Sequence, residues 1–184
     1  IKNKGEVLAW SMYDFANQPF TNLVVTFIYG TFFTTVIAAN EILGTQQWSH
    51  AVTITAIIVA ILSPLMGSLA DKGGYRKLFM LGFTWLTIIA TAVLYFVMPG
   101  EIFRALFWFV IANIGFEMGS VFCNAYLPDI SHSKNIGRIS GYGWSLGYVG
   151  GLIALALAMV FLIKTDTPIF GFGKGELGNY ENIR

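Results

Sequence analysis

The chain has 184 residues, of which 55% are hydrophobic and only 11% are charged, and its formal net charge is +1. A soluble domain carries roughly 25% charged residues, so this composition excludes an ordinary water-exposed globular fold and favours a protein embedded in lipid. The eleven lysines and arginines are scattered along the chain, so we expect no nucleic-acid partner. The single cysteine, Cys123, excludes an internal disulfide and a metal site built from several cysteines.

Five apolar segments are long enough to cross a membrane. The hydrocarbon core is about 30 Å thick and a helix rises about 1.5 Å per residue, so a span needs about 20 mostly apolar residues. The segments that qualify lie at about residues 7–39, 48–69, 78–98, 103–127 and 139–163. We therefore predict an all-α polytopic membrane protein in which residues 1–163 form one helical bundle. The Gly-rich residues 164–184 are expected to form an outer loop that leads to a sixth helix, which the chain lacks.

The distribution of basic residues predicts the orientation of the bundle. With the amino terminus inside, seven of the eleven lie in inner segments: Lys2, Lys4, Lys72, Arg76, Lys77, Lys134 and Arg138. The other four lie in outer segments: Arg104, Lys164, Lys174 and Arg184. Because cytoplasmic loops carry the excess of basic residues, we expect a cytoplasmic amino terminus.

Polar side chains follow one face of the first and of the fourth predicted helix. The first set has i, i+3, i+4, i+7 spacing and the second has i, i+4, i+7, i+11 spacing, which places each set on one side of its helix. The sets are Asp14, Asn17, Gln18 and Thr21, and Asn113, Glu117, Ser120 and Asn124. A polar stripe cannot face lipid, so each must face other helices or a water-filled cavity.

We interpret both stripes as the lining of a substrate path. The alternative is interhelical hydrogen bonding that only holds the bundle together. A charge at the bilayer centre costs at least about 2.5 kcal/mol, which favours a functional role for Glu117, deep in its span. Asp14 lies nearer the inner interface, where water can hydrate it, and for this residue the two interpretations stay open.

Small residues and one proline shape two of the predicted helices. Gly143, Gly147 and Gly151 recur every four residues in the fifth helix, which lets a second helix approach closely. We interpret them as a packing surface; the alternative is a sliding contact used in conformational exchange. In the first helix, Pro19 removes a backbone donor and is expected to bend the helix.

The segment GSLADKGGYRK, residues 67–77, follows the second predicted helix. It resembles the motif G-x-L-a-D-(R/K)-x-G-(R/K)-(R/K), which joins helices two and three of major facilitator transporters. The matching residues are Gly67, Leu69, Asp71, Lys72, Gly74 and Arg76, and Tyr75 stands where a basic residue is usual. The resemblance implies an inner gate built on Gly67, Asp71, Lys72, Gly74 and Arg76, with Asp71 and Arg76 as its latch.

Two further segments narrow the resemblance. WSMYDFAN at residues 10–17 and GYGWSLGYVGG at residues 141–151 are similar to the vacuole-effluxer-like branch, which includes autophagy-related vacuolar amino-acid effluxers and their bacterial relatives. The resemblance implies a twelve-helix protein with two six-helix halves, in a bacterial cytoplasmic or a vacuolar membrane. This chain would supply helices one to five of the amino-terminal half. In that fold helices one and four line the central cavity, and these are the helices that carry the polar stripes.

The sequence departs from the superfamily pattern at two places. The fourth helix carries Glu117 and lacks the intramembrane arginine common in proton-coupled members. The fifth helix carries Tyr148 where the antiporter motif has proline. The coupling ion and the direction of transport therefore stay open.

From these observations we predict a secondary active transporter that works by alternating access. Its expected partners are a small polar solute, an amino acid by the resemblance, together with the lipid bilayer, the missing carboxyl-terminal half and a proton as candidate coupling ion. No catalytic constellation and no metal-ligand motif is present in the sequence, so we expect no enzymatic activity and no cofactor. The alternative is a non-transporting membrane receptor or assembly protein on the same fold.

Overall fold

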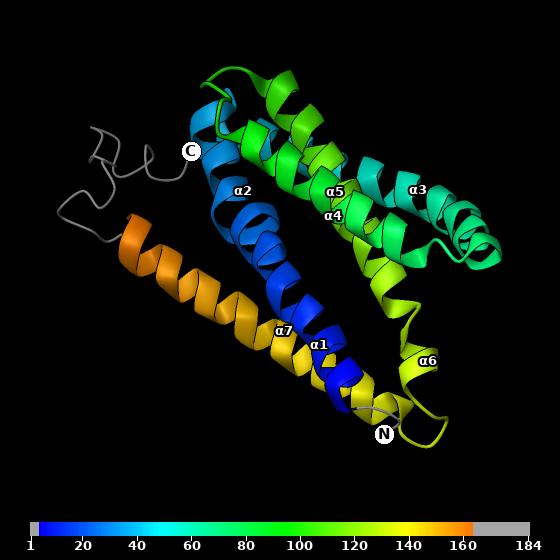
Figure 1. Cartoon of the computed structure of the whole chain (residues 1–184). Helices are drawn as coiled ribbons and strands as arrows, with labels where there is room; N and C mark the ends of the chain where they lie inside the picture. Colours follow the sequence, from blue (N-terminus) through cyan, green and yellow to red (C-terminus); the bar gives the residue numbers. More distant parts are fainter. Residues whose placement is uncertain (1–3, 164–184) are drawn as a thin grey trace.

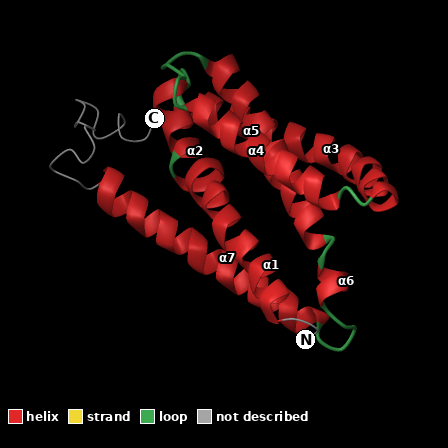
Figure 2. Ribbon diagram, viewed as in Figure 1, coloured by secondary structure: helices red, strands yellow, loops and turns green. Residues whose placement is uncertain are grey.

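The computed structural model describes residues 4–163, and every regular element within them is helical (Figures 1 and 2). Five helical segments are long and apolar enough to cross a membrane: Lys4–Ile37, Glu41–Asp71, Arg76–Leu94, Ile102–Ile130 and Ile136–Phe161. The predicted class, an all-α polytopic membrane protein with five spans, is confirmed. The predicted outer loop at residues 164–184 lies outside the described residues.

The first span is a helix that changes its form near Pro19. Its four parts are α1 (Lys4–Phe20), the π-helix η1 (Thr21–Phe27), α2 (Tyr29–Phe32) and the π-helix η2 (Phe33–Ile37). Pro19 has no N–H to donate to the preceding turn, and the wider turns of η1 begin two residues later. Within η1 the Val25 carbonyl accepts a hydrogen bond from the indole N–H of Trp48, at 3.2 Å.

The second span is longer than the predicted segment 48–69, since α3 runs from Glu41 to Gly73. Asn40 caps its first turn, and the Asn40 side chain accepts a hydrogen bond of 2.8 Å from the N–H of Leu43. The hydroxyls of Thr45 and Ser49 donate to the carbonyls four residues before them, at 2.8 Å each. These polar residues belong to the helix, so the break between the first two spans covers only residues 38–40 and is shorter than the gap between the predicted segments.

The carboxyl-terminal end of α3 is set by a glycine. Gly74 has a φ of 66°, in the left-handed region that glycine adopts readily, and its N–H bonds to the Ala70 carbonyl. The chain then reverses and α4 (Arg76–Leu94) begins two residues later. This tight turn places the gate motif between two long helices.

The remaining spans also differ from the predicted bounds. The predicted segment 78–98 is α4, which ends at Leu94, and the chain turns at Gly100, where φ is 89°. The segment 103–127 is α5 (Ile102–Asn124), followed by the single turn α6 (Leu127–Ile130), whose Pro128 cannot continue the preceding helix. The segment 139–163 is α7 (Ile136–Ala158) with the π-helix η3 (Met159–Ile163).

The helices pack in two groups, and contacts between α1 and α5 join the two groups. In one group α7 lies alongside α1, and in the other α5 packs against both α3 and α4 (Figure 1). The indole N–H of Trp10 on α1 donates to the Cys123 carbonyl near the end of α5, at 2.8 Å. The same carbonyl also accepts a bond from the Tyr126 N–H at 3.1 Å, so the Trp10 bond adds a link between α1 and the end of α5.

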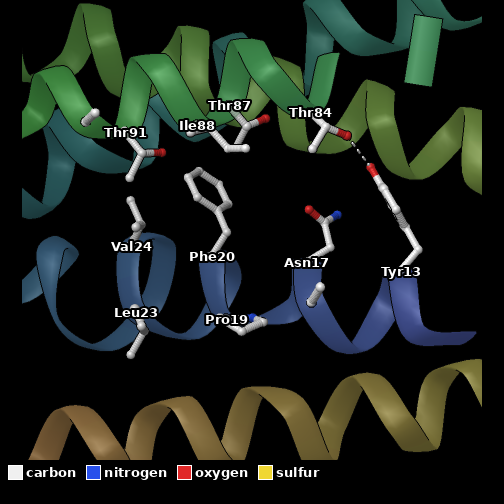
Figure 3. Close-up of a pocket in the computed structure, with 12 residues that line it drawn as sticks. Tyr13, Asn17, Pro19, Phe20, Leu23, Val24, Thr84, Thr87, Ile88 and Thr91 are labelled. Atoms are coloured by element: carbon white, nitrogen blue, oxygen red, sulfur yellow. Dashed lines mark hydrogen bonds between the residues drawn. The ribbon is translucent and has the colours of Figure 1, made fainter. Parts of the chain in front are cut away.

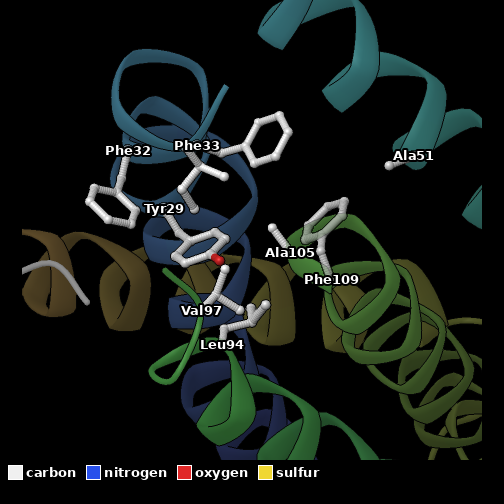
Figure 4. Packing of buried hydrophobic residues seen from close by; sticks show 9 residues of the cluster. Tyr29, Phe32, Phe33, Ala51, Leu94, Val97, Ala105 and Phe109 are labelled. Atoms are coloured by element: carbon white, nitrogen blue, oxygen red, sulfur yellow. The ribbon is translucent and has the colours of Figure 1, made fainter. Parts of the chain in front are cut away.

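The largest buried apolar cluster of the described residues lies where η2, α3 and α5 meet the turn after α4. Phe33, Ile37, Val97 and Phe109 are each at most 2% exposed (Figure 4). The Trp48 ring stacks on Phe109 with 3.9 Å between ring centroids. This cluster holds these ends of the first, second and fourth spans against one another.

Elsewhere large apolar side chains point outward. On α3, Ile54, Ile57, Ile61 and Leu65 are all at least half exposed. A soluble protein rarely exposes a continuous apolar face of this kind, whereas lipid acyl chains cover it without cost. The surface of the bundle therefore agrees with the composition of the chain.

Candidate functional site

A hollow of about 300 Å³ between α3 and α5 contains two members of the fourth-span stripe. The hollow is lined by Asn113 and Glu117 from α5 and by Val52, Thr55, Ala56, Val59 and Ala60 from α3. Ala56 and Ala60 are small, which leaves room beside the two polar side chains. The Thr55 hydroxyl is bonded to the Ala51 carbonyl of its own helix, at 3.1 Å.

The two polar groups of this hollow lack partners within the described part of the chain. Asn113 is only 5% exposed, and no described group forms a hydrogen bond with its amide. Glu117 lies one turn further along α5, is exposed, and forms no ion pair with a described side chain. Because Asn113 lines the hollow and its amide can both donate and accept, the hollow is suited to a polar ligand that would bond to Asn113.

The first-span stripe faces α7 for part of its length. A Cβ placed on Gly147 would lie 3.6 Å from the Asp14 Cβ, and one placed on Gly143 would lie 3.0 Å from Asp14 Oδ2. One turn later, a Cβ on Gly151 would meet Gln18 Cγ at 3.1 Å. Asp14 and Gln18 therefore lie against the glycine face of α7, and both remain half-buried.

The glycine face of α7 is tighter at some positions than at others. At Gly143 an added Cβ would lie 2.5 Å from the Trp10 ring, whereas at Gly147 it would find ordinary van der Waals contact. At Gly150 the same Cβ would collide with the backbone carbonyl of Phe15. Gly150 is thus the position at which α1 and α7 approach most closely, and the four-residue spacing did not predict it.

The two stripes meet at one hydrogen bond. Asn17 Nδ2 donates to Ser120 Oγ at 3.2 Å, between α1 and α5. Next to it the rings of Phe20 and Phe116 stack with 5.1 Å between centroids. Asn17 and Ser120 therefore support the interpretation in which polar side chains hold the helices together.

A larger hollow, about 620 Å³, lies between the first span and α4. Figure 3 shows Asn17 and Phe20 pointing from the first span toward Thr84, Thr87 and Thr91 of α4. The lining is mostly apolar, no charged side chain belongs to it, and the hydroxyls of Tyr13 and Thr84 are hydrogen-bonded at 3.0 Å. The smaller hollow at Glu117 is the better candidate for recognition of a polar solute, because it holds a carboxylate.

The gate motif is organised by Arg76 at the start of α4. Its Nε donates to Asp71 at 2.6 Å and its Nη1 donates to Asp129 of α6 at 2.8 Å, with a longer bond to the Ala125 carbonyl. Arg76 therefore ties the turn between α3 and α4 to the end of α5. Both carboxylates are more than half exposed, so each pair stabilises the fold by only about 0.2–1 kcal/mol.

The other members of the motif have simpler surroundings. Gly74 forms the turn described above, and a Cβ on Gly67 would find no atom within 4 Å. Gly67 therefore has no close packing neighbour among the described helices. The side chain of Lys72 lies outside the described part of the structure.

Several residues of the two stripes, which were predicted to line one path, lie apart in the structure. Asp14 lies at the α1–α7 contact and Glu117 lies at the α3–α5 hollow, so the two carboxylates face different neighbours. Thr21 falls in η1 and is half-buried, and Asn124 is exposed at the end of α5. A single path lined by all eight stripe residues stays a prediction.

Two residues of these sites were not predicted from the sequence. Asp129 follows Pro128 between two predicted spans. Nothing in the spacing of the sequence pairs its carboxylate with Arg76. Gly150 lies beside Gly151, outside the regular spacing, so only the register of α1 against α7 reveals it. Among the described residues no cluster of three or more potential metal ligands exists.

Taken together, the fold and its sites define a class: a polytopic helical membrane protein with polar groups held at the centre of its bundle. A sequence profile of the family described as "Vacuole effluxer Atg22 like" matches residues 49–172, which is more than half of the chain. The chain belongs to the vacuole effluxer Atg22-like family, and the resemblance seen in the sequence is confirmed.

Several curated proteins are similar to the chain. An uncharacterized MFS-type transporter, YxiO of Bacillus subtilis, is 28% identical over 164 residues, which cover 86% of this chain and 38% of YxiO. An uncharacterized protein of Aquifex aeolicus is 32% identical over 80% of this chain and 36% of its own length. Autophagy-related protein 22 of Coccidioides immitis is 32% identical over 43% of this chain and 13% of its own length.

The chain thus spans a little over a third of the length of the two bacterial relatives. No solved structure matches the chain. Relatives of the multi-pass transporter type support an integral membrane protein, in agreement with the five spans.

Proposed function

We propose that the complete protein is a secondary active transporter that moves a small polar solute bearing a protonated amine, such as an amino acid, by alternating access. The observation that carries this proposal is the hollow between α3 and α5. There the buried, unpaired amide of Asn113 lies one turn from the Glu117 carboxylate, in the middle of a membrane span.

The chemistry of this hollow favours a cationic group on the solute. A carboxylate within the bilayer is costly unless it is paired or protonated, so Glu117 would bind an ammonium group or carry a proton when the solute is absent. The Asn113 amide offers both a donor and an acceptor to a second polar group of the same solute. The family description, in which an effluxer is named, supports export as the direction of transport.

The chain would supply five helices of the amino-terminal half, with residues 164–184 as an outer loop that leads to the sixth helix. A carboxyl-terminal half would close the hollow at Glu117 from the other side. The amino terminus would be cytoplasmic, because the predicted inner segments carry most of the basic residues.

A flux assay with the complete protein in proteoliposomes tests the proposal. We expect concentrative movement of amino acids or other small amines under a pH gradient, and no movement of matched carboxylic acids that lack the amine. Liposomes without protein provide the baseline, and dissipation of the gradient tests coupling. Movement of the carboxylic acids alone, or of no solute in the screen, would contradict the proposal.

Arg76 forms ion pairs with Asp71 and Asp129, and we propose that these pairs act as a latch during transport. We expect Arg76→Gln to slow transport at least tenfold, because the turn between α3 and α4 loses its tie to α6. The thermal midpoint should change by less than about 4 °C, since exposed ion pairs contribute little to stability. Lys77→Gln removes a neighbouring exposed cation and should leave transport unchanged. Equal transport by both variants would exclude the latch.

A further inference from the structure

A groove of about 280 Å³ lies at the beginning of α1 and α7, away from the hollow at Glu117. It is lined by Lys4, Val7, Leu8 and Ser11 of α1 and by Tyr142, Ser145 and Leu146 of α7. Figure 1 shows that both helices begin at the same end of the bundle, where the amino terminus is marked. The groove therefore lies at a membrane surface and not at the bilayer centre.

The register of the two helices places basic residues at the mouth of this groove. Trp10 lies at Gly143, Asp14 at Gly147 and Gln18 at Gly151, so α1 and α7 run parallel with a constant offset. The same offset puts Lys4 level with the first turn of α7. Arg138 belongs to that turn and precedes Tyr142 by four residues, on the same face of α7.

Several polar groups of the groove can donate hydrogen bonds and lack partners among the described residues, whereas the Ser145 hydroxyl already donates to the Gly141 carbonyl at 2.7 Å. Lys4 and Arg138 are exposed and form no ion pair with a described side chain. Deeper in the groove, Ser11 is 1% exposed, and its buried hydroxyl has no hydrogen-bond partner in the described part of the chain. No acidic side chain lines the groove. Such a set is complementary to an anion with several oxygen acceptors.

The apolar side chains beside the groove favour an anion that carries an acyl chain. Leu8 is 58% exposed, and Met12, one turn deeper into the membrane, is 44% exposed. These side chains continue the groove as an apolar surface along α1, which suits an acyl chain below a phosphate. Basic residues beside a membrane span are attracted to anionic lipids, by about a fivefold gain in affinity per residue.

We propose that this groove binds the phosphate of an anionic phospholipid in the leaflet at which α1 begins. Lys4 and Arg138 hold the phosphate charge, Ser11 and Tyr142 donate hydrogen bonds to its oxygens, and Leu8 and Met12 contact the acyl chain. The proposal rests on the α1–α7 groove alone and holds whether or not the protein transports an amine.

Native mass spectrometry of the complete protein, released from nanodiscs of phosphatidylglycerol and phosphatidylcholine in equal amounts, tests this site. We expect the wild-type protein to retain phosphatidylglycerol in preference to phosphatidylcholine. Lys4→Gln combined with Arg138→Gln should weaken that retention by about 25-fold, and Ser11→Ala should weaken it less. Lys134→Gln, which removes an exposed cation outside the groove, serves as the control.

Three results would overturn the proposal. The wild-type protein could retain both lipids equally, or the double variant could retain phosphatidylglycerol as the wild type does. Inorganic phosphate, added at millimolar concentration, could displace the lipid completely, which would assign the site to free phosphate. An unchanged elution volume and thermal midpoint in the double variant ensure that a loss of lipid does not reflect unfolding.

Discussion

We expect Glu117→Gln in the complete protein to abolish coupled transport. The substitution keeps the shape of the side chain and removes the negative charge from the hollow between α3 and α5. In the complete protein, where the proposed carboxyl-terminal half closes the hollow, loss of one partner from the ion pair between Glu117 and the amine would cost about 3–5 kcal/mol, so the initial rate should fall by on the order of 100-fold or more. The rate of amine movement in proteoliposomes, at matched protein content, measures this effect.

Glu41→Gln is a suitable control for this experiment. Glu41 is an exposed carboxylate in the first turn of α3, far along that helix from the hollow. Its neutralisation should leave the rate unchanged. Transport by the Glu117→Gln protein at the rate of the wild type would remove Glu117 from the mechanism.

The second large effect should appear at the contact between α1 and α7. We expect Gly150→Ala to destabilise the protein by about 2 kcal/mol, because the added methyl group collides with the backbone carbonyl of Phe15, which cannot rotate away. This loss corresponds to a fall in thermal midpoint on the order of 5 °C, which thermal unfolding in detergent can measure.

Two other glycines of α7 provide matched controls. A Cβ on Gly141 would meet no atom within 4 Å, and a Cβ on Gly147 would find ordinary van der Waals contact with Asp14. Alanine at either position should be neutral or slightly stabilising, because glycine inside a helix costs up to about 1 kcal/mol relative to alanine. A midpoint for Gly150→Ala as high as that of Gly141→Ala would show that the helices are not in close contact.

The five spans were predictable because membrane insertion depends on a property that each segment carries by itself. The length and hydropathy of a segment decide whether it can cross, so neighbouring helices hardly matter. The positions of the helix ends depend on local hydrogen bonds, which the hydropathy of a segment does not predict. Asn40 and Gly74 extend α3 beyond its apolar part, through a side-chain cap at one end and a left-handed turn at the other.

The polar site was only partly predictable from the sequence. Spacing places Asp14 with Gln18, and Asn113 with Glu117, on one face of a helix each. Spacing does not say which helix packs against that face, and the structure assigns α7 to the first pair and α3 to the second. The partners of Arg76 differ in the same way. Asp71 is near Arg76 in the sequence, whereas Asp129 reaches Arg76 only because α5 packs against α4.

Cysteine labelling of α3 in the complete protein tests the central claim most directly. Cys123 is buried, so a cysteine introduced at Ala60 or Ile61 can be followed with a water-soluble thiol reagent once cysteines outside this chain are replaced. Both residues are exposed in this chain, but Ala60 lines the hollow with Glu117, whereas Ile61 does not and belongs to the apolar face of α3. We predict that Ala60→Cys reacts, that a transported amine protects it, and that Ile61→Cys stays unlabelled in the membrane. Equal labelling at the two positions, or labelling of Ala60→Cys that no amine reduces, would contradict a solute site between α3 and α5.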